Sequence, residues 1–427
     1  MSGDAGRAAT YYEATATPFS AGPPVEGDQT VDVAVVGAGY TGLGAALALA
    51  QRGYRTLVVE QGRTASGASG RNGGQIHPGH RRDMAAIEAM VGDADARKLW
   101  ALAEEARAYQ TALIAEHGID CSYRPGLIHA AHKRAFLADY RKDIEHLASR
   151  YGYGELEFVD RDKLAALIGT DAYQGGMLDR GGGHVHALNW ALGIAGAAQQ
   201  AGARISEHTR ALSYRREGGR AVLTTSRGTI RADWLLLCAD GSLDGIDAAV
   251  EARVMPINNF MIATEPLGEA HPEILPGGQA VSDSRFVVNY WRLTPERRLL
   301  WGGGENYRRG FPRDIRGLVS RHMLQAYPRL QDVRIDHAWG GTLGITMRRV
   351  PYVRRLAPNL LTAAGYSGVG VMLGPYFGKL LGEAVAGNME RVDLLSRLPV
   401  PPFPGGKLLR WPTMVAGLSY YALRDRL

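Results

Sequence analysis

The chain has 427 residues, of which 45% are hydrophobic and 22% charged, so it has enough apolar material for a folded protein of two or three domains. Its formal net charge of +6 comes mainly from arginines scattered along the chain rather than from a basic tract, and we therefore expect no nucleic-acid partner. With two cysteines and no apolar run of about 18 residues, the composition excludes a disulfide framework, a cysteine zinc cluster and an integral membrane segment, and it indicates a cytoplasmic protein without a metal site.

Residues 1–30 are poor in bulky apolar side chains and lack the basic start and apolar stretch of a secretory signal. We expect them to form an arm that lies on the first domain. From residue 31 the sequence changes to "VDVAVVGAG", an apolar run typical of a strand buried on both faces of a parallel sheet. "YTGLGAALALAQRG" then predicts a helix with a face of small residues, and "TLVVE" predicts a second buried strand. Together the three segments predict a βαβ unit.

The turn of this unit carries Gly37, Gly39 and Gly42 in the spacing G-x-G-x-x-G. The first glycine permits a tight turn, the second lets the backbone approach a pyrophosphate, and the third lets the helix pack closely on the strand. Glu60 closes the second strand, where a carboxylate accepts hydrogen bonds from a ribose and repels the 2′-phosphate of NADP. The pattern predicts a dinucleotide site and leaves NAD and FAD both open.

Further along, residues 83–150 predict an inserted, mainly helical region, and "HALNWALGIAGAAQQAG" predicts a helix followed by short strands as far as Gly241. Residues 251–332 alternate between polar and apolar side chains, as in an antiparallel sheet. "NLLTAAGYSGVGVMLGPYFGKLLGEAVAG" then repeats the order of strand, glycine-rich turn and helix. The amphipathic segment "LLRWPTMVAGLSYYALRDRL" at residues 408–427 is expected to pack on its own domain, and contact with a membrane or a partner is the alternative.

Six segments together carry a more specific pattern. They are "DVAVVGAGYTGLGAALALAQRGYRTLVVE", "GASGRNGGQ", "HVHALNWALGIA", "NYWR", "WGGTLGITMRRVPYVRRLAPNLLTAAGYSGVGVMLGPYFGKLLGEAVAG" and "FPGGKLLRWP". With them the chain resembles the D-amino-acid oxidase and sarcosine oxidase superfamily of FAD enzymes, and within it the gamma-glutamylputrescine oxidase group. The resemblance implies an α/β fold with a Rossmann-like FAD-binding domain and a second, α+β substrate domain built on an antiparallel sheet. The expected boundaries are 31–84, 151–250 and 333–398 for the discontinuous FAD-binding domain, 85–150 and 251–332 for the substrate domain, 1–30 for the arm and 399–427 for a tail.

The resemblance also implies where FAD contacts the chain. The glycine-rich segment "ASGASGRNGGQI" would run past the pyrophosphate and along the isoalloxazine ring, and the turn at 365–369 would present a helix N-terminus to the flavin pyrimidine edge. A glycine-rich surface loop is the alternative for the first of these. The residues expected to contact FAD are Gly37, Gly39, Tyr40, Thr41, Gly42, Glu60, Gln61, Ser69, Arg71, Asn72, Gly73, Gly74, Gln75, Ala211, Gly241, Gly365, Tyr366, Ser367, Gly368 and Val369.

Three departures from the sarcosine oxidases affect the expected chemistry. Met372 stands where those enzymes have a lysine for the substrate carboxylate. No cysteine follows Cys238, so we expect FAD to be bound non-covalently. No lysine occurs between Lys163 and Lys379 that could lie over the ring and assist oxygen reduction, so oxygen and another electron acceptor both stay open.

For the substrate pocket we look to the second domain, where aromatic side chains on adjacent strands could hold an amine by cation–π and apolar contacts. Alternating aromatics are also typical of a core, so both interpretations stay open. No catalytic side chain is assigned, and we expect His77, His80, His184 and His186 to be structural. The pocket candidates are Asn289, Tyr290, Trp291, Trp301, Glu305 and Tyr307 in this domain, together with Trp339, Tyr366 and Met372 from the other domain.

We therefore expect an FAD-dependent oxidoreductase that oxidises the C–N bond of an amine to an imine, which water converts to an aldehyde and ammonia, while oxygen is reduced to hydrogen peroxide. The resemblance implies gamma-glutamylputrescine or a related acylated polyamine as substrate. One alternative is a secondary amino acid such as pipecolate or proline, with its carboxylate bound by Arg292, Arg348 or Arg349. An amine dehydrogenase with another acceptor, and a protein that uses FAD structurally or passes electrons to a protein partner, are further alternatives.

Overall fold

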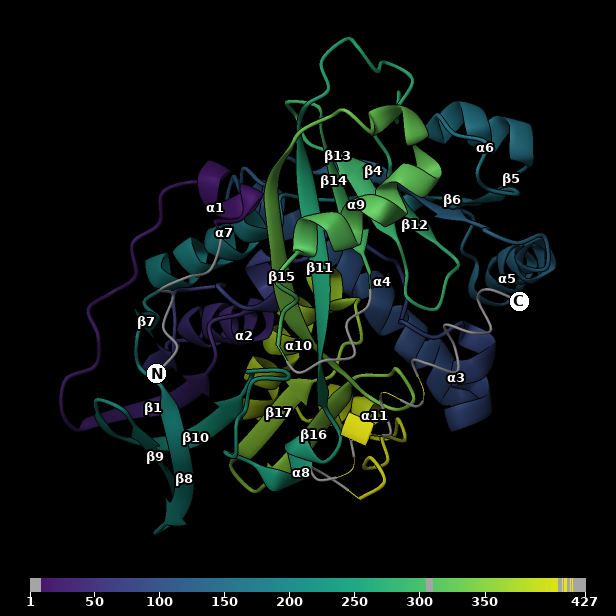
Figure 1. Ribbon diagram of the computed structural model, residues 1–427. Coiled ribbons are helices and arrows are strands. Elements are labelled where there is room, and N and C mark those ends of the chain that lie inside the picture. Colours follow the sequence, from purple (N-terminus) through teal and green to yellow (C-terminus); the bar gives the residue numbers. More distant parts are fainter. Residues whose placement is uncertain are drawn as a thin grey trace.

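The computed structural model describes residues 9–304 and 310–405, together with positions 409, 411, 412, 415 and 417 of the segment that follows. Two mixed sheets form the framework, one of eight strands and one of nine. In Figure 1 the nine-stranded sheet lies above the eight-stranded one, and its long strands β11 and β15 reach down toward it. The expected α/β architecture with a second sheet is confirmed.

The eight-stranded sheet has the order β16-β17-β10-β1-β2-β7, with the β8–β9 hairpin joined to β10. Strands β7, β2, β1, β10 and β17 run parallel, and β16 is antiparallel to β17. The inner strands are apolar runs buried on both faces, as helices on a parallel sheet require. The bounds are β1 (Gln29–Val36), β2 (Thr56–Val59), β7 (Arg204–Ser206), β8 (Ala211–Glu217), β9 (Arg220–Thr225), β10 (Gly228–Leu237), β16 (Tyr352–Ala357) and β17 (Leu360–Ala364).

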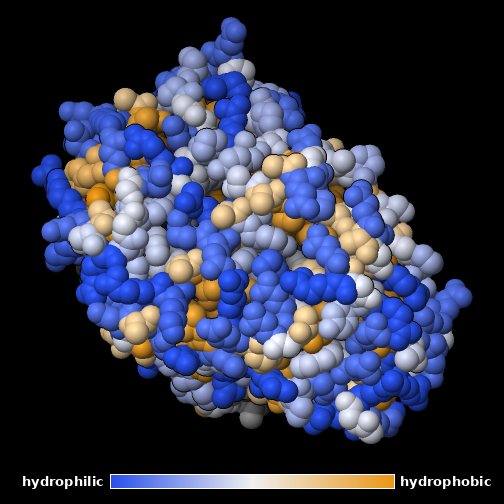
Figure 2. All heavy atoms as spheres, turned by 180° about the vertical axis from the view of Figure 1, so that it is seen from behind, coloured by the Kyte–Doolittle hydropathy of each residue, from blue (hydrophilic) through white to orange (hydrophobic). Residues whose placement is uncertain are grey.

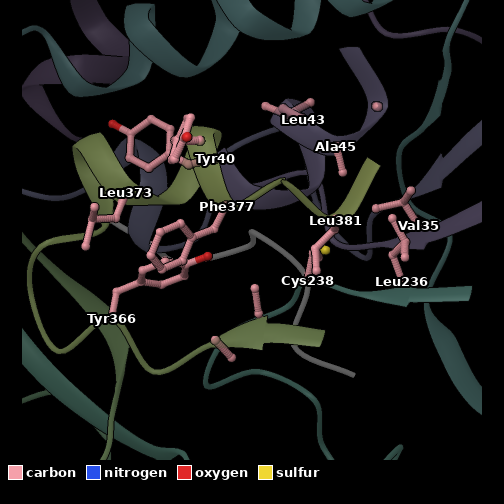
Figure 3. Close-up of a cluster of buried hydrophobic side chains, with 14 of the residues drawn as sticks. Val35, Tyr40, Leu43, Ala45, Leu236, Cys238, Tyr366, Leu373, Phe377 and Leu381 are labelled. Atoms are coloured by element: carbon pink, nitrogen blue, oxygen red, sulfur yellow. The ribbon is translucent and has the colours of Figure 1, made fainter. Parts of the chain in front are cut away.

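Helices α2 (Tyr40–Ala50), α7 (Ala187–Gln200) and α10 (Gly370–Val385) pack around this sheet, with α2 between the other two. Glycines allow α2 and α10 to approach closely: a Cβ at Gly378 would lie 2.0 Å from the carbonyl oxygen of Thr41. Figure 3 shows the buried cluster that results, in which Phe377 and Leu381 lie with Cys238. The close packing places the N-terminal ends of α2 and α10 at the same edge of the sheet.

The nine-stranded sheet has the order β15-β11-β14-β13-β12-β4-β6-β3, with β5 joined to β6. It is antiparallel except for the pair β4–β12. Helix α9 (Ile315–Ala326) covers one of its faces (Figure 1). The bounds are β3 (Gln75–Ile76), β4 (Arg124–Ala130), β5 (Leu156–Val159), β6 (Gly176–His184), β11 (Met255–Pro266), β12 (Ala280–Asp283), β13 (Tyr290–Leu293), β14 (Arg298–Gly303) and β15 (Ile335–Ile345).

The domain boundaries expected from the sequence remain a proposal, but the strand pairing differs from them at four strands. Strands β3, β5, β6 and β15 belong to the nine-stranded sheet, whereas the expected ranges 31–84, 151–250 and 333–398 put them in the FAD-binding domain. The physical reason is composition: the glycine-rich runs of β6 and β15 lack the regular alternation by which strands of the second sheet are identified.

The other helices lie mainly at the periphery, and α4 packs against α3 and α10. Among the described residues no helix is long and apolar enough to cross a membrane. Figure 2 shows that hydrophilic residues cover most of the rear face, with hydrophobic residues in scattered small patches. The bounds are α1 (Tyr11–Thr15), α3 (Met84–Val91), α4 (Asp93–Glu116), α5 (Phe136–Tyr151), α6 (Arg161–Ile168), α8 (Ala248–Glu251) and α11 (Glu390–Ser396), with short 3₁₀ helices η1 (Ala68–Gly70) and η2 (Pro328–Leu330).

Candidate active site

The turn between β1 and α2 has no room for side chains at its glycines. A Cβ at Gly42 would lie 1.9 Å from the carbonyl oxygen of Gly37, and one at Gly37 would lie 2.9 Å from that of Cys238. Gly39 is the N-cap of α2 and offers no side chain to the first turn. The hydroxyl of Ser69 accepts a hydrogen bond from the backbone N–H of Tyr40 at 3.0 Å. Apart from this bond, no side chain of the described residues caps the first turn of α2, and such a helix N-terminus has the geometry that binds a phosphate group.

Glu60 lies beside this turn at the end of β2. Its carboxylate accepts backbone hydrogen bonds from Ala38 at 3.0 Å and Gly62 at 2.9 Å. Burial raises the pKa of Glu60, while these N–H groups oppose the shift. The backbone N–H of Gln61 also acts to lower this pKa. The N–H of Thr209 donates a hydrogen bond to the backbone carbonyl of Glu60 at 2.7 Å. Glu60 is thus fixed where a carboxylate can accept the hydroxyls of a ribose.

Ala211 begins β8, shortly after the Thr209 contact with Glu60, and is buried. Gly241 is placed differently. A Cβ there would lie 3.3 Å from the Cα atoms of Gly344 and Pro256, so packing against the nine-stranded sheet accounts for its small size. A cofactor contact at either residue remains a prediction.

The glycine-rich loop before β3 is tightly bonded within itself. The side-chain amide of Asn72 donates to the carbonyls of Ala68 at 2.9 Å and Ser69 at 2.8 Å, and its oxygen accepts from the N–H of Gly74 at 2.7 Å. A Cβ at Gly73 would lie 2.6 Å from the ring of Tyr290. Close approach of the second sheet therefore explains part of the glycine content, and the loop is not a plain surface loop.

The loop is also held from β15 and from the amino-terminal arm. Arg71 is buried; its Nε donates to the carbonyl of Gly340 at 2.9 Å and its Nη1 pairs with Glu13 at 3.1 Å. The indole of Trp339 donates to the carbonyl of Arg71 at 3.0 Å. The expected positive charge in the loop is thus present, and a carboxylate from the arm partly balances it.

A second arginine links the same three parts of the chain. Arg292 on β13 donates from Nε to the carbonyl of Gly73 at 2.9 Å and from Nη2 to the hydroxyl of Tyr12 at 3.1 Å. The ring of Tyr12 packs edge-on against Trp339, with 5.7 Å between centroids. The sequence interpretation missed Tyr12 and Glu13, because the arm was expected only to lie on the domain. A signal was available in "TYYE", where Thr10 and Glu13 form a capping box for α1.

Gln75 follows on β3, where its side-chain amide donates to the carbonyl of Val281 at 2.7 Å. The amide therefore ties the end of the glycine-rich loop to β12.

At the carboxyl end, the turn before α10 depends on a residue that the sequence did not single out. The buried carboxylate of Asp240 accepts hydrogen bonds from the N–H groups of Gly365 at 2.7 Å and Gly344 at 2.5 Å. Burial raises its pKa, while these N–H groups oppose the shift. Gly365 and Ser367 both have positive φ, at 73° and 55°. Asp240 thus joins this strained turn to β15.

The rest of the turn faces α2. The hydroxyl of Tyr366 bonds to that of Thr41 at 2.6 Å, and Figure 3 shows its ring in the buried cluster near Phe377. Val369 is the N-cap of α10, and a Cβ at Gly368 would meet no atom within 4 Å. Tyr366 therefore lies with the dinucleotide unit, whereas Trp339, which was expected from the same domain, lies on β15 of the nine-stranded sheet.

The candidates on the nine-stranded sheet divide between its two faces. Tyr290 and Trp339 lie on the face toward the glycine-rich loop before β3, as their contacts with that loop show. Trp291 and Trp301 lie on the opposite face, stacked at 4.5 Å and fully buried in the core, so their expected place in a pocket is wrong. Alternation of side chains along a strand requires this division.

Four other pocket candidates are also placed away from that face or not described. Asn289 donates to Asp283 at 3.0 Å, and Met372 is buried in α10. Glu305 and Tyr307 lie outside the described residues. Arg348 is exposed, and the guanidinium of Arg349 lies over the ring of Phe286.

Three of the four histidines singled out from the sequence take structural roles, namely His80, His184 and His186. His186 caps α7 by accepting the N–H of Asn189 at 3.0 Å, and His184 and His80 bond to backbone carbonyls. Burial lowers the pKa of His186 to about 4 and that of His184 to about 3. Within the described ranges no group of three or more His, Cys, Asp or Glu side chains could hold a metal ion.

These residues fit FAD as a cofactor. The bare first turn of α2 suits the pyrophosphate, Glu60 suits the ribose, and the loop ending at Gln75 leads from that turn to the second sheet. Gly37 and Gly42 leave no room for a Cβ, which would meet the carbonyl oxygens of Cys238 and Gly37, so the tight turn that the dinucleotide motif requires is present.

Comparison with known proteins agrees with this geometry. The family of FAD dependent oxidoreductases (DAO) matches residues 32–384. A probable oxidoreductase OrdL of Rhizobium meliloti is 43% identical over 98% of this chain and 97% of its own length. The gamma-glutamylputrescine oxidoreductase of Escherichia coli is 37% identical over 98% of each chain.

Solved structures share the fold. Glycine oxidase from Geobacillus kaustophilus has a TM-score of 0.72 at 23% identity, over 84% of this chain and 95% of its own. L-proline dehydrogenase from P. horikoshii has a TM-score of 0.72 at 17% identity, over 87% of this chain and 98% of its own. The chain belongs to the family of FAD dependent oxidoreductases, and its cofactor is FAD.

Proposed function

We propose that this oxidoreductase oxidises the C–N bond of the terminal amine of an N-acylated diamine, with gamma-glutamylputrescine as the first candidate. The observation that carries the proposal is the 37% identity, over nearly the full length of both chains, to an enzyme named for that substrate. FAD, when bound, supplies the two-electron oxidation of the C–N bond, and the protein supplies binding and orientation. The products are an imine, hydrolysed to an aldehyde and ammonia, and hydrogen peroxide if oxygen is the acceptor.

In this proposal the two glycine turns and the loop hold the cofactor. The first turn of α2 binds the pyrophosphate, Glu60 binds the ribose, and residues 71–75 with the turn at 365–369 lie along the flavin ring. Non-covalent binding is supported by both cysteines in the described part of the chain, because burial raises the thiol pKa of Cys121 and Cys238 to about 12. A thiolate is the form that attacks a flavin, and these thiols stay protonated.

The loop-facing surface of the nine-stranded sheet forms the wall of the proposed pocket. Tyr290 donates from its hydroxyl to Asn259 at 2.5 Å, and burial raises its pKa, so the phenol stays neutral. Such an aromatic wall excludes water and favours the uncharged amine, which is the form that can be oxidised. No side-chain acid or base is required, and we expect activity to rise toward alkaline pH.

A secondary amino acid is less well supported as substrate. Of the arginines suggested for its carboxylate, Arg292 is engaged by Gly73 and Tyr12. Met372 is buried in α10 and offers no charge. The electron acceptor, a cytoplasmic location and the absence of nucleic-acid partners stay predictions.

The test is turnover in air with product identification. Gamma-glutamylputrescine, putrescine, N-acetylputrescine, L-proline and L-pipecolate are supplied to the flavin-loaded protein, and mass spectrometry follows aldehyde formation beside assays for ammonia and peroxide. We expect an aldehyde and ammonia from gamma-glutamylputrescine. Turnover of the cyclic amino acids alone would overturn the proposal, and aldehyde formed only with an artificial acceptor would identify a dehydrogenase.

A further inference from the structure

A cluster of nitrogen bases lies beside the proposed pocket. His77 directly follows β3, the strand in which the flavin loop ends, and its ring centroid lies 5.7 Å from that of His129 on β4. The hydroxyl of Ser282 on β12 lies 3.3 Å from Nδ1 of His129. Arg81 is close enough for its charge to lower the pKa of both imidazoles. The cluster thus combines one cation with two imidazoles and a hydroxyl.

Arg81 has no counter-charge in the part of the chain that the structure describes. It makes no hydrogen bond or ion pair there, and the charge that acts on its own pKa is that of Arg82, another cation. Burial lowers the pKa of Arg81, although the residue keeps some exposure to solvent. The same holds for His77: burial lowers its pKa, and the residue keeps some exposure to solvent. A cation that is crowded by protein atoms and has no partner costs free energy that an anion would offset.

The strand register puts this cluster on the same face as the proposed pocket wall. His129 is opposite Ser282, and Ser282 is opposite Tyr290. Residues that face each other across neighbouring strands project from the same side of a sheet. The row continues through Gly302 and Met261 to Trp339, which contacts the flavin loop. His129 therefore lies two strand spacings from Tyr290, or about 10 Å.

This distance suits the substrate class proposed above. A gamma-glutamyl group carries a free carboxylate at the end of the molecule remote from the amine to be oxidised. In an extended gamma-glutamylputrescine the intervening chain is long enough to cover two strand spacings. When the reacting carbon lies near Tyr290 and Trp339, the carboxylate can reach the cluster.

We propose that Arg81, His77 and His129 form a subsite that binds the carboxylate of the acyl group of an N-acylated diamine. Arg81 supplies the charge and the imidazoles and Ser282 supply hydrogen bonds. The subsite selects an acidic acyl group over a neutral one, and it does not take part in the oxidation. This inference rests on the proposed function, because it assigns one end of the same substrate.

The experiment compares gamma-glutamylputrescine with N-acetylputrescine, which has the same reacting amine and no carboxylate. Anaerobic stopped-flow reduction of the bound flavin gives the limiting rate and the apparent Kd for each, whatever the electron acceptor. We expect the wild-type protein to favour gamma-glutamylputrescine at least about tenfold, mainly through Kd, since a buried charge pair is lost with the neutral analogue. Arg81→Gln should lower this preference at least about tenfold relative to the wild type.

Arg82→Gln is the matched control, because Arg82 is the neighbouring arginine and is exposed. It should keep the wild-type preference. Calorimetry with gamma-glutamylbutylamine, which has the carboxylate but not the terminal amine, provides a binding measurement independent of turnover, and Arg81→Gln should weaken that binding to the same extent. His129→Gln tests the subsite should the arginine variant fail to fold.

An unchanged substrate preference in folded Arg81→Gln and His129→Gln, or a wild-type protein that does not distinguish the two substrates, would overturn the subsite. Both results leave amine oxidation standing. If neither amine reduces the flavin, the proposed function itself has failed, and binding of gamma-glutamylbutylamine still decides whether the carboxylate site exists.

Discussion

Two strand–glycine–helix units meet at the candidate site, and they are built in different ways. In the unit of β1 and α2, local sequence spacing sets the geometry, since the Cβ of Gly42 would collide with Gly37 five positions earlier. In the unit of β17 and α10, a distant carboxylate sets it: Asp240 holds Gly365 across 125 positions of sequence. The geometry of the first unit can therefore be read from a short motif, whereas the contact that sets the geometry of the second becomes clear only in the folded chain.

The largest effect is expected from breaking the first unit. Gly42→Val should leave the protein without bound FAD and destabilised by about 3 kcal/mol or more, because its side chain overlaps the backbone of Gly37. Flavin absorbance per protein and thermal unfolding measure both effects. Gly67→Ala is the control, since its Cβ would meet no atom within 4 Å; full flavin content in Gly42→Val would mean that this turn does not hold FAD.

The second unit should respond to Asp240. In Asp240→Ala two buried N–H groups lose their acceptor, at a cost of about 1 to 3 kcal/mol each, and we expect the Kd for FAD to rise at least about tenfold. Asp240→Asn keeps one acceptor oxygen and should fall between the alanine variant and the wild type. Titration of the apoprotein with FAD gives the Kd. An equal Kd for FAD in all three proteins would mean that this turn does not contribute to FAD binding.

Helix α7 packs on α2 and also touches α10, since Trp190 donates to the carbonyl of Val371 at 3.0 Å. Its cap should be sensitive to pH. His186 has a pKa of about 4 in the folded protein and about 6.5 when unfolded, so its stabilising contribution is complete above pH 6.5 and declines as the pH falls toward 4. His186→Asn caps the helix without titrating. Between pH 6.5 and pH 5 the free energy of unfolding, measured with urea, should therefore fall by about 2 kcal/mol less in the variant than in the wild type. An identical fall in both proteins would contradict the low pKa of His186.

The smallest effect is expected at the arm, which supports the loop beside the first unit. Glu13→Gln removes the carboxylate that partly balances Arg71, and because Glu13 is partly exposed the change in stability should stay within about 1 kcal/mol. The less balanced positive charge of Arg71 should stabilise the anionic adduct that sulfite forms with oxidised flavin. The Kd for sulfite should therefore fall a few-fold. Spectrophotometric sulfite titration measures this. A weaker adduct would mean that Arg71 does not act on the flavin.

Much of the fold could be predicted from the sequence because its signals are local. The apolar runs of β1, β2 and β10, the small residues of α2 and the glycine spacing all lie within short segments. Strand β6 was assigned to the other sheet because "GMLDRGGGH" has too few side chains to show a strand period. Backbone pairing, rather than side-chain pattern, decides where such a strand lies.

The candidate site was less predictable where it depends on faces and on distant partners. Alternation in β13 separates Tyr290 from Trp291, but sequence alone does not show which face meets the core. Glu13 reaches Arg71 across 58 positions, and no spacing rule connects them. Tertiary contacts of this kind become visible only when both sheets are in place.

The central claim is tested most directly by adding gamma-glutamylputrescine to the flavin-loaded protein in the absence of oxygen and recording its visible spectrum. The account predicts that the absorbance of the oxidised flavin disappears with about one equivalent of amine, because each amine gives up two electrons to one flavin. A flavin spectrum that neither this amine nor N-acetylputrescine changes would contradict amine oxidation at this site.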